Sequence, residues 1–239
     1  MKLSQTVNQG EPLKPGSRSP ARRGRRVVVR IVFPLLAILT ATVFVEHLLA
    51  RPDLSGFEPA AMGRLESAMW RSYYEGRWFR LGVQTMEVAC GQYNFSWWDG
   101  ARLATHAAVS AAHFRTRTND PRSLPELVSY YRIIERAAPA RFDVSEAARL
   151  ELAWWTERRM KVPPQEYART IAQLTALNYG LNENAALPAA SMRAEAMAYR
   201  DARRDGKMTE LDWSEVTRQL SAAYADLHGR LLPRQETPR

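Results

Sequence analysis

The chain has 239 residues, of which 46% are hydrophobic and 25% are charged, and its formal net charge is +9 at neutral pH. This composition supports a buried hydrophobic core and excludes a wholly disordered or collagen-like protein. The single cysteine, Cys90, excludes an internal disulfide.

The positive charge is concentrated near the N-terminus. Residues 1–30 contain eight basic residues and one acid, whereas residues 51–239 contain 26 basic and 23 acidic residues, a difference of only +3. The body therefore lacks the basic balance of a nucleic-acid-binding domain, and we do not expect a nucleic-acid partner. Residues 1–26 are rich in Pro, Gly, Ser and Arg and are predicted to form a disordered cytoplasmic tail that also contacts anionic membrane lipids.

Residues 27–50 are predicted to form a transmembrane helix that acts as a signal anchor. The uncharged part, residues 31–45, would rise only about 22 Å as a helix, less than the hydrocarbon core of about 30 Å. The whole segment would reach about 36 Å, which suffices if Arg30, Glu46 and His47 lie near the two interfaces. Because basic residues precede the segment, we expect a cytoplasmic N-terminus at the inner membrane and an extracytoplasmic C-terminal domain.

Two alternatives remain for this segment. A cleaved signal peptide requires small residues before the cleavage site, but residues 48–50 read Leu-Leu-Ala, so cleavage is disfavoured. A twin-arginine export signal is indicated only by the paired arginines within residues 22–26.

The rest of the chain is predicted to be one helical domain. A linker at residues 51–56 precedes the domain at residues 57–232, and a disordered tail follows at residues 233–239. Apolar residues recur at helical spacing, and no segment alternates as a strand does. Helices are expected near residues 58–76, 78–91, 97–117, 123–138, 143–160, 164–180, 188–205 and 209–231. The predicted fold is therefore all-α, with one N-terminal transmembrane helix followed by a soluble multi-helix bundle or helical-hairpin array.

Several of these helices begin at recognisable capping residues. Ser96 can cap one helix, and Ser123 with Glu126 has the spacing of a capping box. Asp143 with Glu146 and Thr209 with Asp212 have the related acidic spacing. In the helix that follows Ser96, alanines at 101, 104, 107, 108, 111 and 112 predict a small-residue face against which a neighbouring helix packs closely.

Two glutamates are predicted to point into the core. Glu66 shares a helical face with apolar residues between 62 and 73, and Glu151 shares one with residues 147–154. A buried carboxylate needs a partner, so we predict a buried polar cluster in which arginines, Arg158 and Arg193 among them, pair with these glutamates. Core-facing glutamates on two helices also occur in di-metal bundles, but the Glu-x-x-His pairs of such bundles are absent from the body.

His106 and His113 are seven residues apart and lie on one side of their helix, where they are predicted to form a polar stripe. Zinc binding by this pair would need a third ligand from another element. The sequence contains no phosphate-binding glycine loop, nucleophile elbow or His-Glu-x-x-His motif. We therefore predict no metal, cofactor or catalytic residue.

The sequence favours a membrane-anchored interaction or scaffold component of an envelope assembly, with membrane lipids and proteins as partners. One alternative is an enzyme or metal site built from Glu66, Glu151 and a histidine. A further alternative is a lipid or peptide binder lined by the aromatic doublets of the body, among them Tyr130 and Tyr131.

Overall fold

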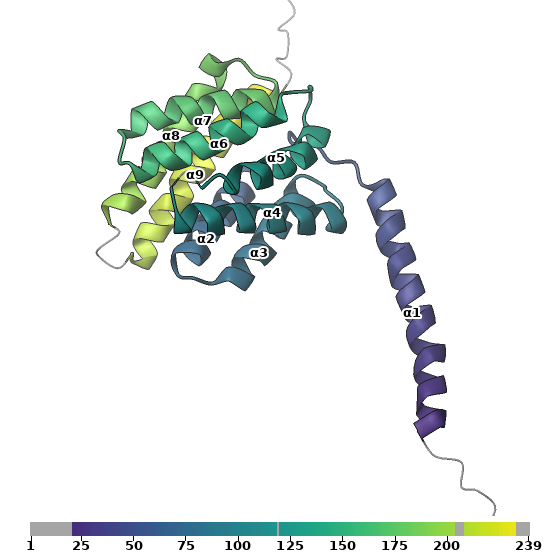
Figure 1. The fold of residues 1–239 in the computed structure, drawn as a ribbon. Helices are drawn as coiled ribbons and strands as arrows, with labels where there is room; N and C mark the ends of the chain where they lie inside the picture. Colours follow the sequence, from purple (N-terminus) through teal and green to yellow (C-terminus); the bar gives the residue numbers. More distant parts are fainter. Residues whose placement is uncertain (1–20, 119, 204–207, 233–239) are drawn as a thin grey trace, which may run out of the picture. The chain divides into compact units, whose positions relative to one another are not determined.

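The computed structural model describes the backbone of residues 21–118, 120–203 and 208–232, and side chains in these ranges from residue 33 onward. All regular elements in these ranges are helical, as predicted (Figure 1). The predicted tail at residues 233–239 lies outside the described residues, as do residues 1–20 of the N-terminal tail. The chain divides into two compact units, residues 1–44 and 45–239.

Helix α1 (Ala21–Leu49) begins six residues before the segment predicted to span a membrane. Among the described residues, no helix combines the length and the apolar character needed to cross a bilayer. The predicted segment starts at Val27, within the stretch of α1 whose side chains are not described.

In the described part of the second unit, eight helices follow α1, together with two short irregular turns. They are α2 (Pro59–Tyr74), α3 (Trp78–Met86), α4 (Trp97–Thr116), α5 (Ser123–Ile134), α6 (Val144–Arg159), α7 (Pro164–Tyr179), α8 (Glu183–Ala202) and α9 (Glu210–Leu231). A π-helical turn, η1 (Glu87–Gln92), follows α3, and a 3₁₀ turn, η2 (Glu135–Ala137), follows α5. Each helix from α2 to α8 packs against the next along the chain, and α9 packs back against α2, so the bundle closes on itself.

The main hydrophobic core lies between α4 and α8 and includes Leu103, Leu127, Ile171 and Met197. Two smaller clusters join α8 and α9 to α2 and its surroundings. Close packing through alanines occurs on α8, where Ala186, Ala190, Ala194 and Ala196 are buried.

The predicted small-residue face of α4 is not a tightly packed seam. Ala108 and Ala112 are exposed, and α4 instead buries Leu103, Ser110 and Phe114. Ser110 and Ser123 donate hydroxyl hydrogen bonds to each other's backbone carbonyls, at 3.1 and 3.3 Å. This reciprocal pair joins α4 to α5 and directs the serine side of α4 inward.

Three of the predicted helix starts are confirmed by their caps. The Ser96 hydroxyl accepts a hydrogen bond from the backbone N–H of Asp99 at 3.1 Å. Asp143 caps α6, and Thr209 forms a capping box with the third residue of α9.

Two other starts differ from the prediction. Ser123 does not cap α5, because its hydroxyl is engaged with α4 and the residue before it occupies the cap position without a side-chain bond. Helix α8 begins at Glu183, capped by Asn182, so Pro188 lies inside the helix rather than at its start. A proline in the second turn of α8 costs stability because it removes a backbone hydrogen bond. Capping by Asn182 and burial of Ala186 stabilise the helix and offset this loss.

Candidate functional site

The first predicted site residue, Glu66, lies in the core side of α2 with only 6% of its surface exposed. Arg193 of α8 donates to its carboxylate from Nε at 2.8 Å and from a second guanidinium nitrogen, and Tyr224 of α9 donates its hydroxyl at 2.7 Å. The Arg193 guanidinium also stacks over the ring of Trp154, 5.5 Å from its centroid. Burial alone would lower the pKa of the Arg193 guanidinium. The charge of the Glu66 carboxylate outweighs that effect, so the pKa is raised.

The other two members of the predicted cluster have different partners. Glu151 accepts hydrogen bonds from the Tyr131 hydroxyl at 2.8 Å and from the indole of Trp154 at 3.1 Å. Arg158 donates to Asp201 at 2.8 and 2.9 Å and to the Tyr74 hydroxyl at 2.8 Å. The structure therefore brings Glu66, Arg193, Trp154 and Glu151 together but places Arg158 in a separate pair.

His106 and His113 do not form a shared site. Nδ1 of His106 lies 2.8 Å from the Glu126 carboxylate of α5, whereas His113 lies two turns further along α4 and takes no part in that pair. Within the described residues, no group of three or more His, Cys, Asp or Glu side chains is placed to hold a metal ion. Burial, reinforced by the nearby Glu46 and Asp99, raises the pKa of the Cys90 thiol, which disfavours the reactive thiolate.

Of the aromatic doublets, Tyr130 and Tyr131 point inward, whereas Trp97 and Trp98 are exposed. Tyr93, Tyr130, Tyr131 and Tyr179 line a cavity of about 90 Å³, and the Tyr93 and Tyr179 hydroxyls are hydrogen-bonded at 2.8 Å. Burial raises the pKa of Tyr179 to about 12. A cavity of this size is smaller than the several hundred Å³ typical of a ligand pocket.

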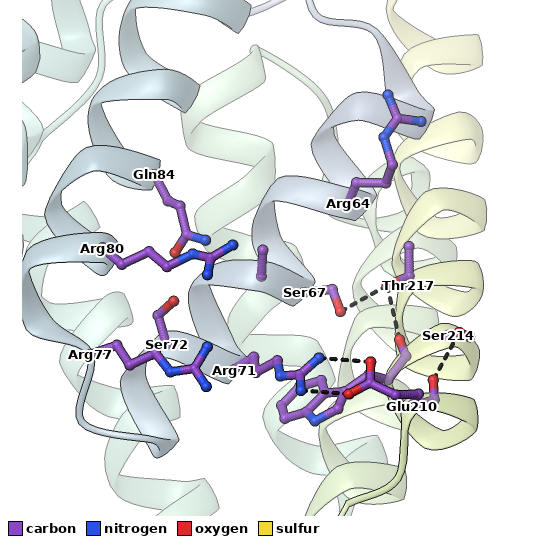
Figure 2. Close-up of a pocket in the computed structure, with 12 residues that line it drawn as sticks. Arg64, Ser67, Arg71, Ser72, Arg77, Arg80, Gln84, Glu210, Ser214 and Thr217 are labelled. Carbon is purple, nitrogen blue, oxygen red and sulfur yellow. Dashed lines mark hydrogen bonds and ion pairs between the residues drawn. The ribbon is translucent and has the colours of Figure 1, made fainter.

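A larger hollow lies between α2, α3 and α9 and encloses about 550 Å³ (Figure 2). We call it the basic groove, because four arginines line it: Arg64 and Arg71 from α2, and Arg77 and Arg80 from the start of α3. Among the described residues, Glu210 from α9 is its one lining acid. Figure 2 shows Arg77 and Arg80 turned toward the same space as the Arg71–Glu210 pair.

The arginines of the basic groove differ in how far they are neutralised. Arg71 makes a two-pronged ion pair with Glu210, at 2.8 and 2.6 Å, and a third bond to Glu75, and these carboxylates raise the pKa of its guanidinium. Arg77 pairs with Glu75 at 2.9 Å. Arg80 is exposed, and its guanidinium has no hydrogen bond or ion pair within the described part of the chain. Arg64 lies 3.8 Å from the Glu58 carboxylate, so Arg80 is the groove arginine without a carboxylate partner among the described residues.

An apolar patch adjoins the basic groove on α3. Its members, Trp78, Phe79 and Val83, are 48%, 87% and 47% exposed. The Arg115 guanidinium lies over the Trp78 ring, 5.2 Å from its centroid. Sequence reasoning missed both the groove and the patch. The available signal was the seven-residue spacing of Arg64 and Arg71, which places both on one face of α2.

No family model, curated protein or solved structure matches this chain.

Proposed function

We propose that this protein is a membrane-anchored interaction component of an envelope assembly, which binds an acidic segment of a partner protein in the basic groove. The observation that carries the binding role is Arg80, whose guanidinium has no partner among the described residues, beside the exposed Phe79 at the edge of a groove of about 550 Å³. Large exposed apolar residues next to arginine are typical of protein interfaces.

The described turns of α1 support the anchor. Five large apolar side chains here are each more than half exposed, and they lie around the helix rather than on one face: Phe33, Leu35, Leu36, Ile38 and Leu39. A helix that is apolar all round requires an apolar environment. With the basic residues that precede it, this favours the inner membrane, with the N-terminus in the cytoplasm and the helical domain outside.

The groove favours an acidic partner for reasons of charge. Glu210 and Glu75 already occupy Arg71 and Arg77, whereas the Arg80 guanidinium is available. A carboxylate from a partner can form a two-pronged pair with Arg80 while its apolar neighbours contact Phe79 and Val83. Such a contact combines specificity from the ion pair with affinity from the buried aromatic ring.

The binding role can be tested by photocrosslinking in cells. With Phe79 replaced by photoreactive benzoylphenylalanine, the full chain should form a discrete adduct in the membrane fraction. The Arg80→Glu substitution in the same chain should abolish the adduct, and Arg80→Lys should retain part of it. The control Arg141→Glu changes an arginine whose side chain is 93% exposed and lies outside the groove, and should leave the adduct unchanged. An adduct insensitive to Arg80→Glu would contradict the proposal.

The proposed topology has its own test. A reporter fused after Arg239 should be active outside the cytoplasm only. Activity in the cytoplasm would show that the orientation is wrong.

A further inference from the structure

The last turn of α1 is fixed to the first turn of α4. The Glu46 carboxylate accepts the backbone N–H of Trp97, at 3.0 and 3.2 Å from its two oxygens. Nδ1 of His47 lies 2.9 Å from the Ser96 hydroxyl and 3.5 Å from the Asp99 carboxylate. Both polar side chains at the end of the apolar run are therefore partnered by α4.

The residues that follow Arg51 continue this attachment. The Asn94 side-chain amide donates to the carbonyl of Arg51 at 2.9 Å, and the Leu54 backbone N–H donates to the carbonyl of Ala137 at 3.1 Å. Leu54 is only 2% exposed. The predicted linker is therefore held to the bundle along its length.

Four large side chains remain exposed at this junction. Leu48 and Leu49 at the end of α1 are 65% and 72% exposed, and Trp97 and Trp98 at the start of α4 are 65% and 56% exposed. The Glu46–Trp97 bond places the last turn of α1, which carries both leucines, beside the first turn of α4, which carries both tryptophans. The other exposed apolar cluster in the described part of the bundle, Trp78, Phe79 and Val83, lies on α3 and is the patch beside the basic groove.

We propose that Trp97 and Trp98 are membrane-interface anchors, whose indole rings lie among the lipid headgroups and hold the first turn of α4 against the bilayer. The proposal rests on the membrane anchor proposed above. Tryptophan concentrates at this depth because its ring is apolar while its N–H still bonds to headgroups and water.

Chain continuity identifies lipid as the occupant. Leu48 and Leu49 follow the apolar run of α1 without a break in the helix, and each residue adds a rise of only about 1.5 Å. The headgroup region adds roughly 5–8 Å on each side of the hydrocarbon core, so a helix that leaves the core near Val45 has Leu48 and Leu49 in that layer. Glu46 lies in the same turn of α1 as these two leucines. Trp97, whose backbone N–H donates to Glu46, is therefore placed at the same depth.

The polar residues of the junction fit this position. A charged side chain without a partner is costly inside the hydrocarbon core, and Glu46 and His47 lie where the apolar run ends. Here the Glu46 carboxylate is used to cap α4 and His47 is paired with Ser96 and Asp99. The bundle can therefore rest directly on the membrane surface without leaving these groups unsatisfied.

Spin labels on the full chain in lipid nanodiscs test the inference. In a Cys90→Ala background, single cysteines would be introduced by Trp98→Cys, Leu39→Cys and Leu211→Cys. The label at position 39 should be accessible to oxygen and protected from a water-soluble nickel chelate. The label at position 211 should be accessible to the chelate and less accessible to oxygen than position 39. The label at position 98 should be intermediate, at headgroup depth. Circular dichroism would confirm that each variant retains its helical content.

The outcomes separate this inference from the anchor on which it rests. If position 98 is as exposed to the chelate as position 211 while position 39 is protected, the interface inference is wrong and the anchor stands. If position 39 is also exposed to the chelate, the anchor itself is wrong.

A second measurement needs no label. Brominated lipids should quench the tryptophan fluorescence of the full chain, and Trp97→Phe with Trp98→Phe should remove most of that quenching. The Trp78→Phe substitution on α3 serves as the matched control and should preserve it. Quenching that survives the double substitution would overturn the inference.

Discussion

Glu66 and Arg193 form an ion pair in which each side chain depends on the other. Glu66→Gln would leave the Arg193 guanidinium and the Tyr224 hydroxyl without the carboxylate to which both donate. We expect a loss of about 3 kcal/mol in the free energy of unfolding, since breaking a buried pair from one side leaves an uncompensated charge. Urea unfolding followed by circular dichroism would measure it.

A surface pair supplies the control for this substitution. Glu215→Gln removes the partner of Arg218 on the exposed side of α9 and should change stability by less than about 0.5 kcal/mol. Replacing both core partners, by Glu66→Leu with Arg193→Met, should cost less than Glu66→Gln alone. Equal losses for Glu66→Gln and Glu215→Gln would contradict a structural role for Glu66.

Asp201 should make stability depend on pH in the acid range. Burial tends to raise the pKa of this carboxyl group, but hydrogen bonds and charge from Arg158 and Arg200 outweigh it, so the pKa lies below its usual value. A lowered folded pKa gives stability that is present above the unfolded pKa, about 3.9 for Asp, and is lost as pH falls through the folded value. The melting temperature of Asp201→Asn should therefore fall less steeply than that of the wild type below about pH 4. Parallel acid profiles would contradict this.

Periodicity predicted that Glu66 and Glu151 face inward, but it did not indicate the buried Asp99 and Asp120, and it could not predict partners. Glu66 falls on the apolar stripe of α2, as expected, yet its partner arrives from a helix 127 residues away. Glu151 was expected to pair with an arginine and is instead held by Tyr131 and Trp154. Partners depend on how helices are arranged around the closed bundle, and that arrangement is a long-range property.

At the scale of helices, Gly63 controls how closely α2 approaches α9. A Cβ atom at this position would lie 2.5 Å from the backbone nitrogen of Ser221 and 2.6 Å from its Cα. Because backbone atoms cannot rotate away, Gly63→Ala would force the two helices apart. We expect a loss of stability of roughly 1–3 kcal/mol, as for other overpacking substitutions, measured by thermal and urea unfolding.

Gly82 provides the matched control in α3. A Cβ atom there would meet no other atom within 4 Å. Gly82→Ala should therefore stabilise the protein by about 0.5–1 kcal/mol, because alanine favours the helix. If both substitutions had the same sign, close packing of α2 on α9 would not be the cause.

Helix starts were predicted well where the cap is local and poorly where a distant element takes the capping group. The hydroxyls of Ser96 and Thr209 bond to backbone N–H groups within their own first turns. Ser123 carries the same type of signal, but its hydroxyl bonds to Ser110 of the neighbouring helix. A local sequence signal therefore fails at the point where a tertiary contact offers the same hydroxyl another partner.

At the scale of the whole molecule, the core is independent of the apolar N-terminal helix. Within the described residues, every buried hydrophobic side chain lies between Leu54 and Leu227. The packing of α9 against α2 closes the bundle using residues of the second unit alone. The proposed membrane anchor and the buried core therefore lie in different parts of the chain.

This separation predicts the behaviour of a chain that begins at Val45. Because it keeps the core together with the Glu46 and His47 contacts to α4, it should unfold cooperatively, at the same midpoint as the full chain in the same detergent. Circular dichroism melts of the two chains would make the comparison. The shortened chain should also leave the membrane fraction on high-salt washing, whereas the full chain should stay. A lower midpoint would show that residues before Val45 stabilise the bundle, and retention in the membrane would place the main attachment on the bundle itself.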